Sequence, residues 1–286
     1  MFKTLCPHAI GVIAKDVRDA LIAAKTGGFQ GLDVSAAEIA NLVDQQGASA
    51  VKQLFADAGV IPAAFGLPTD WRTSEENWKR DLDQLPRQAK SAAAIGIART
   101  FTWIMPCSDE RPLEANRAFH IERFKPIAKV LADHGISLGL EFIGPRTLRR
   151  SQKFPFIYKM GDMLAMGREI GANVGVLLDC WHWYTSGGTL DELGALRPEQ
   201  VVYVHVNDAP PNVPVDQQID NVRLLPGESG VIDIAGFLRA LEQIGYDGPV
   251  TPEPFKKGLN DLPSDEARLK VVGAAMDKVF AQAGLL

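Results

Sequence analysis

The chain has 286 residues, 46% of them hydrophobic, and a formal net charge of −5 from 30 basic and 35 acidic residues. This length and apolar content allow a sizeable core, and the mild acidity argues against a nucleic-acid-binding protein, which needs a basic surface. No apolar run approaches the roughly 20 residues of a membrane span, and the amino-terminal MFKTLCPHAI lacks a secretory apolar segment, so we expect no membrane association.

The cysteines and the lack of linkers constrain the organisation of the chain. Cys6, Cys107 and Cys180 are scattered and odd in number, which is not typical of a disulfide framework or of a CxxC zinc site. We therefore predict reduced, buried thiols in a cytoplasmic protein. No linker or low-complexity segment divides the sequence, so residues 1–286 are predicted to form one domain.

Apolar runs and helical periodicity alternate along the chain. Short apolar runs bounded by turn residues predict strands, and segments with one apolar face, several of them ended by glycine, predict helices. A first strand is expected to begin near Cys6 and to close at residues 11–13, which places His8 toward its carboxyl end. The other strands are predicted at residues 29–34, 60–65, 98–103, 136–141, 174–179, 201–206 and 249–253. The helices are predicted at residues 16–25, 36–58 (interrupted near Gly47), 75–95, 113–134, 157–170, 234–244 and 264–281.

Eight strand-then-helix units of about 30 to 40 residues indicate an α/β protein with parallel strands and crossover helices. Two architectures fit this pattern, an open doubly wound sheet and a closed (β/α)8 TIM barrel. The count of eight favours the barrel. No G-x-G-x-x-G motif follows the first strand, which argues against a dinucleotide-binding fold.

Four consecutive predicted strands end in a side chain that can bind a metal. The runs LGLE, VLLD, VYVH and VTPE end at Glu141, Asp179, His205 and Glu253. A carboxylate at the end of a buried strand costs free energy unless it is paired, hydrogen-bonded or bound to a metal. In a barrel these four ends converge at one face, whereas in an open sheet the outer two would lie roughly 14 Å apart. The pattern therefore predicts both a barrel and a metal site.

Two Glu, one Asp and one His form a mostly oxygen ligand set of charge about −3, which suits Mn(II), Mg(II), Co(II) or Zn(II). A divalent ion of this kind can polarise the carbonyl of a sugar derivative and stabilise an enediolate. Glu141 and Glu253 come from strands three apart, so they would face each other across the barrel mouth. One could remove a proton from carbon while the other delivers a proton to the opposite face.

Several segments resemble the xylose isomerase-like TIM barrels, the superfamily of sugar isomerases and epimerases that also contains endonuclease IV. The resemblance is strongest from residue 136 onward and is most similar to inosose isomerases and ketose 3-epimerases. The segments that carry it are LEF at 140–142, LLDCWH at 177–182, VHVND at 204–208, RLLPGESGVID at 223–233 and YDGPVTPEPF at 246–255.

The resemblance implies a role for each of the motif residues. One divalent ion would be held by Glu141, Asp179, His205 and Glu253, and the two glutamates would also be the acid/base pair. His182 would resemble the family histidine that hydrogen-bonds the substrate oxygen near the metal. Arg223 would correspond to the substrate-contacting arginine of the inosose isomerase branch.

Two features depart from the family pattern. Ketose 3-epimerases tend to carry an arginine six residues after the metal histidine, and this chain has Pro211 there, which favours a different polyol. Pro252 and Pro254 flank Glu253, and because proline removes a donor from the strand ladder, this strand end is expected to be shaped differently.

Other residues are weighed for the pocket. His8, Trp71 and Trp103 follow predicted strand ends and are candidates for substrate contact, since aromatic rings stack on the apolar faces of sugars; each has core packing as its alternative. Trp181 and Trp183 would cover the barrel mouth or a subunit contact, which leaves a homo-oligomer open. A basic cluster at Arg146, Arg149 and Arg150 suits a phosphate or carboxylate, or is a solvated loop, and Glu228 is expected to belong to a tight turn.

The first hypothesis for function is a metal-dependent isomerase or epimerase of a sugar or keto-polyol. The second is a lyase on the same scaffold, either a keto-polyol dehydratase or a deglycosidase of 3-keto-glycosides, because the enediolate step is shared. A nuclease resembling endonuclease IV needs three zinc ions and more than the five histidines present. A non-catalytic sugar-binding protein is disfavoured by the pair of glutamates.

Overall fold

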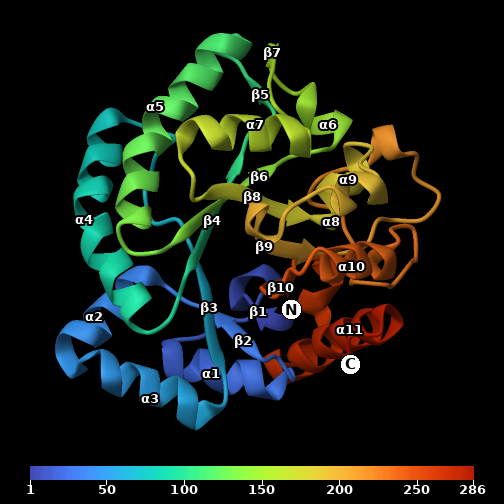
Figure 1. The fold of residues 1–286 in the computed structure, drawn as a ribbon. Helices are drawn as coiled ribbons and strands as arrows, with labels where there is room; N and C mark the ends of the chain where they lie inside the picture. The colour runs from blue at the N-terminus through green and yellow to red at the C-terminus, as the bar shows by residue number, and fades with distance from the viewer.

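The computed structural model describes residues 1–286 and contains a closed barrel of eight parallel strands. Figure 1 shows the strands in the centre and helices around them. Around the barrel the order is β1-β10-β9-β8-β6-β4-β3-β2, so neighbours in the barrel follow one another along the chain. The predicted TIM barrel is confirmed. The strands are β1 Phe2–Leu5, β2 Gly31–Asp33, β3 Ile61–Gly66, β4 Arg99–Ile104, β6 Ser137–Phe142, β8 Val174–Asp179, β9 Val201–Val206 and β10 Pro249–Pro252.

Helices connect the strands, and side-chain caps fix where several of them begin. Asp16, Ser35, Ser74, Asp233 and Ser264 each accept a backbone N–H from the first turn of the following helix. The long helical stretch after β2 is broken at Gly47, whose φ of 82° favours glycine. The main helices are α1 Val17–Thr26, α2 Ala36–Gln46, α3 Ala48–Ala58, α4 Glu75–Ala94, α5 Leu113–Ala132, α7 Met160–Ile170, α10 Ile234–Gln243 and α11 Asp265–Ala283.

The prediction for the first strand is wrong. The strand lies earlier, at Phe2–Leu5, and Pro7–Ile10 is a 3₁₀ helix. Lys3 and Thr4 conceal the strand in the sequence because they are polar yet buried, with Lys3 paired to Asp277. Several short elements had no recognisable pattern in the sequence: α6 Arg146–Arg149, α8 Cys180–Thr185, α9 Leu190–Gly194, and β5 Cys107–Ser108 paired with β7 Phe154–Pro155.

The strand register brings the predicted metal ligands to the same end of the barrel. Asp179 of β8 lies opposite His205 of β9, and Glu141 of β6 lies opposite Leu177 of β8. Glu253 follows β10 directly, and its N–H donates to the carbonyl of Val206 at 3.2 Å. The prolines beside Glu253 therefore do not end the contact between β10 and β9.

Two packed regions stabilise the barrel. A small interior group of Ala64, Leu177 and Tyr203, with Phe101 against it, fills the barrel near the candidate site. A larger apolar core lies between the strands and the helices. The three cysteines are buried and unpaired, as predicted. None of the helices combines the length and apolar composition needed to cross a membrane.

His120 gives the core a pH-dependent element. Its ring stacks on Phe156 and packs beside Trp71, and burial lowers its pKa to about 4. Between about pH 6.5 and pH 4 the unfolded chain binds a proton at this ring and the folded chain does not. The free energy of unfolding therefore decreases as the pH falls through this range, by at most about 1.4 kcal/mol per pH unit from this group. In urea denaturation between pH 7 and 4, wild type should lose more stability than His120→Phe. Parallel curves for the two proteins would contradict this prediction.

Candidate metal centre

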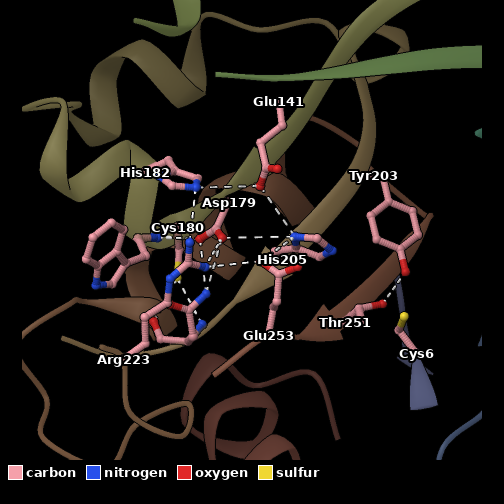
Figure 2. A network of polar contacts seen from close by, with 12 residues as sticks. Cys6, Glu141, Asp179, Cys180, His182, Tyr203, His205, Arg223, Thr251 and Glu253 are labelled. Atoms are coloured by element: carbon pink, nitrogen blue, oxygen red, sulfur yellow. Dashed lines mark hydrogen bonds and ion pairs between the residues drawn. The ribbon is translucent and has the colours of Figure 1, made fainter. Parts of the chain in front are cut away.

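Four side chains from consecutive barrel strands converge at the barrel mouth (Figure 2). One ligand atom from each of Glu141, Asp179, His205 and Glu253 lies within 4.8 Å of the others. From Nδ1 of His205, the nearest carboxylate oxygens are 3.5 Å away on Glu141, 4.0 Å on Asp179 and 3.4 Å on Glu253. Ligand atoms about 2.0 to 2.3 Å from a tetrahedral ion lie about 3.3 to 3.8 Å from one another. The distances from His205 to Glu141 and Glu253 fall in this range, so the spacing suits a shared ion.

Two polar atoms of this cluster support the same interpretation. Oε1 of Glu141 and Nδ1 of His205 are buried and lie 3.5 Å from each other, yet neither makes a hydrogen bond. Buried polar atoms without partners are costly and rare in folded proteins. A divalent cation would satisfy both atoms, and the mix of carboxylate and imidazole suits such an ion. The cluster is therefore a candidate divalent-metal site.

The pKa values of Glu141 and Glu253 are shifted in opposite directions by their environments. Burial raises the pKa of Glu141 to about 7. Burial also acts to raise the pKa of Glu253, but His205 and Arg223 outweigh it and lower that pKa. The same carboxylates raise the pKa of His205 well above its ordinary value, although burial opposes this. Two carboxyl groups with separated pKa values are typical of an acid/base pair. A bound divalent ion would hold all four ligands in their unprotonated forms.

Asp179 is oriented by the backbone that follows it. It is the N-cap of α8, and its Oδ1 accepts the N–H of Trp181 at 2.7 Å and the side-chain amide of Asn207 at 3.1 Å. These bonds fix the carboxylate and leave Oδ2 directed toward the cluster. They also start the short helix that carries His182.

His182 is buried beside the cluster, and its ring is held by a close backbone contact. The N–H of Gly144 donates to Nδ1 at 3.2 Å, while Nε2 faces the charged side chains of the cluster. Burial lowers the pKa of His182 to about 3 and keeps it neutral. Nε2 lies 3.8 Å from Glu141 and 3.6 Å from Asp220. A Cβ on residue 144 would lie 2.3 Å from the His182 carbonyl oxygen, so only glycine allows this contact.

Arg223 is a buried cation between the acidic side chains. Its Nη1 contacts Asp179 at 2.8 Å and Glu253 at 3.1 Å, and its Nη2 contacts Asp220 at 2.8 Å. The same Nη2 lies 3.2 Å from Nε2 of His182. Coulombic attraction from these carboxylates raises the pKa of Arg223 despite burial, so the side chain stays charged and orients the carboxylates around it.

Removing Arg223 is expected to destabilise the metal-free protein. Arg223→Met leaves buried carboxylates without their cation, which typically costs about 3–5 kcal/mol. Urea denaturation in the presence of a chelator measures this loss. Arg239→Met is the matched control, because Arg239 is exposed and bonds only the carbonyl of Gln282. Equal small effects of the two substitutions would show that Arg223 does not offset the buried charge.

The loop that carries Arg223 is anchored by Asp208, the last residue of the VHVND segment. The carboxylate of this fully buried residue accepts the N–H groups of Ser229, Gly230 and Ile232. Glu228 belongs to the same turn, where it accepts the N–H of Leu225. These hydrogen bonds thus stabilise the loop that carries Arg223 at the barrel mouth.

The cluster opens into a cavity of about 640 Å³ at the barrel mouth. His8, Trp103 and Arg223 line it together with Glu141, His182, His205 and Glu253. The side chain of Trp103 is 44% exposed there. Trp71 instead lies in the core against Phe124 and is only 3% exposed, because the loop after β3 turns its indole inward. Trp71 does not line the cavity, so the prediction that it contacts the substrate is wrong.

Sequence reasoning missed two charged residues that line this cavity, Arg72 and Asp220. Arg72 lies with its guanidinium 4.1 Å from the ring centre of Trp103 and 4.3 Å from that of Trp71. Asp220 faces both His182 and Arg223. Both residues occur in irregular loops, where no strand or helix pattern marks them. The one signal available for Arg72 was its place directly after Trp71 in the sequence.

The remaining predicted residues lie away from the cluster or in the core. Trp183 is buried against Phe237, so the suggested subunit contact is wrong for this residue. Trp181 is fully buried and lies 4.7 Å beneath the guanidinium of Arg223. The basic cluster is divided: Arg146 pairs with Asp216, and Arg149 stacks on Tyr158.

Comparison with known proteins gives consistent similarities. Residues 21–276 match the family model described as xylose isomerase-like TIM barrel. The chain is 29% identical over 220 residues to an inosose isomerase of Halalkalibacterium halodurans, covering 76% of this chain and 74% of that protein. It is 24% identical over 218 residues to a 3-dehydroshikimate dehydratase of Pseudomonas aeruginosa, covering 75% of this chain and 32% of that protein.

Solved structures show the same fold. A xylose isomerase domain protein from Alicyclobacillus acidocaldarius aligns with a TM-score of 0.86 and 32% identity over 99% of both chains. A crystal structure of the IOLI protein with a bound zinc atom aligns with a TM-score of 0.77 and 16% identity, also over 99% of both chains. The second likeness concerns the fold alone.

Proposed function

Because the chain belongs to the xylose isomerase-like TIM barrel family, we propose that it is a divalent-metal-dependent isomerase or epimerase of a sugar or keto-polyol. The proposal rests on one observation: Glu141 and Glu253 lie in a single cluster with Asp179 and His205. The similarity to an inosose isomerase supports a cyclic keto-polyol as one substrate.

In this proposal Glu141, Asp179, His205 and Glu253 hold the ion, which when bound supplies Lewis-acid polarisation of the substrate carbonyl. One of the two glutamates removes the proton from the carbon beside the carbonyl, and the other delivers a proton to the opposite face. His182 hydrogen-bonds the substrate oxygen through Nε2, and its burial keeps the ring neutral.

The walls of the mouth cavity would orient the substrate. His8 offers a ring nitrogen for hydrogen bonding, Arg223 places its positive charge in the wall, and the exposed indole of Trp103 offers a flat face for the C–H groups of a sugar ring. Trp71 receives no contact in this proposal, because its ring lies in the core. Sugar rings need such mixed walls, since one face is apolar and the rim is polar.

A lyase is the second candidate, and the similarity to a 3-dehydroshikimate dehydratase favours it. Dehydration and glycoside elimination begin with the same proton removal beside a carbonyl. They differ only in the group that leaves the enediolate. The same residues would serve, with the delivering glutamate protonating the leaving oxygen.

Product analysis in D2O tests the proposal. The manganese-loaded protein is incubated with inosose, psicose or a 3-keto-glucoside, and the products are followed by NMR. An isomer carrying deuterium at the carbon beside the carbonyl is the expected result. Loss of water or of an aglycone would establish the lyase instead, and no deuterium exchange with any of these compounds would count against both. Glu253→Gln serves as the inactive comparison.

A further inference from the structure

A second cavity adjoins the mouth cavity on the side of β1 and β2. It has a volume of about 500 Å³ and is lined by segments that follow these two strands. His8, Gly66 and Phe101 line both cavities, so the two spaces are neighbours. We call the second space the side chamber. None of the roles assigned above to the mouth cavity uses it.

The side chamber has a polar group whose bonding is incomplete. Asp33, at the end of β2, is 9% exposed; its Oδ2 accepts the hydroxyl of Tyr203, while its buried Oδ1 has no partner. In Figure 2, Tyr203 and Cys6 lie beyond His205, on the opposite side from Arg223. A buried carboxylate oxygen without a partner costs free energy, which a hydroxyl from a ligand would offset.

The lip of the side chamber is apolar. Ile13 lines the chamber and is 86% exposed, the highest exposure among the large hydrophobic side chains. Val12 and Ala14 flank it in the same loop and also line the chamber. An exposed isoleucine beside a polar interior presents the two surfaces that a sugar ring needs, an apolar wall for its C–H groups and a hydrogen-bond partner for its hydroxyls.

We propose that the side chamber is a second subsite that receives another sugar ring, so that the substrate is a glycoside whose keto-sugar ring lies at the metal centre. The inference rests on the proposed function of that centre. The second ring packs its C–H groups on Ile13 and hydrogen-bonds Asp33 through a hydroxyl. His8, common to both cavities, lies where the two rings join. The chain would thus prefer a two-ring substrate over a free monosaccharide.

Calorimetric titration of the manganese-loaded protein tests this subsite. The probes are methyl β-D-glucopyranoside, methyl β-cellobioside and methyl β-gentiobioside, which have no free carbonyl and cannot react by proton transfer. At least one of the two-ring probes should bind about tenfold more tightly than the one-ring probe, as expected for burial of one apolar contact. Ile13→Ser and Asp33→Asn should remove most of this preference without changing the affinity for methyl β-D-glucopyranoside.

Ile22→Ser is the matched control, because Ile22 is also exposed, at 64%, but lies outside the chamber. It should keep the wild-type preference, and since neither isoleucine is buried, both serine variants should fold. Equal affinity for one-ring and two-ring probes, or a preference that survives Ile13→Ser and Asp33→Asn, would overturn the subsite. Binding of methyl β-D-glucopyranoside that does not depend on Mn²⁺ would instead count against the metal centre and, with it, the inference.

Discussion

Replacing Glu253 with Gln is expected to lower kcat by about 10²–10⁴-fold, the usual contribution of a positioned acid or base. The substitution keeps the size of the side chain but removes the group that exchanges the proton. His205 and Arg223 lower the pKa of Glu253, so at neutral pH it is the carboxylate, the form that can accept a proton. Initial rates with the substrate identified by product analysis, measured at saturating Mn²⁺, give kcat.

Two comparisons make this prediction specific. Glu169→Gln is the matched control, because Glu169 is an exposed residue of α7 that pairs with Arg117 and does not line the mouth cavity; it should leave kcat unchanged. Metal content is measured in parallel, so that a loss of proton transfer is separated from a loss of the ion. A Glu253→Gln protein that keeps its metal and retains full kcat would show that Glu253 is not an acid/base group.

Replacing His205 with Ala is expected to abolish the stabilisation of the protein by divalent metal. An ion present at 100 times its Kd stabilises the folded chain by about 2.7 kcal/mol, because it binds the folded state and not the unfolded state. His205 supplies the only nitrogen of the cluster and lies within 4.0 Å of all three carboxylates. Without it, the remaining carboxylates repel one another and bind the ion weakly.

The measurement is the melting temperature with chelator and with excess Mn²⁺. Wild type should show a clear increase with Mn²⁺, and His205→Ala should show none. His134→Ala is the control, because His134 follows α5 and does not line the mouth cavity. An equal increase in wild type and His205→Ala would place the ion elsewhere.

The barrel and the convergence of the four side chains could be predicted because each rests on a local pattern. Branched apolar runs marked the buried strands, and each run ended in Glu141, Asp179, His205 or, past Pro252, Glu253. Parallel strands that close a barrel bring such ends together whatever the loops do. The prediction needed no knowledge of individual side-chain contacts.

The first strand, Trp71 and Arg72 could not be predicted for physical reasons. Lys3 and Thr4 are buried by partners far away in the chain, so their polarity hid the strand. Whether an indole faces a cavity or the core depends on the loop after β3, which has no periodicity. In the same way, Asp33 could be placed at a strand end, but its unpaired oxygen is visible only once Tyr203 is in position.

Diffraction from crystals grown with Mn²⁺, recorded where manganese scatters anomalously, tests the central claim most directly. The proposal predicts one strong anomalous peak within bonding distance of Glu141, Asp179, His205 and Glu253. A map with no peak at the barrel mouth, or with its peak bound by other residues, would contradict it.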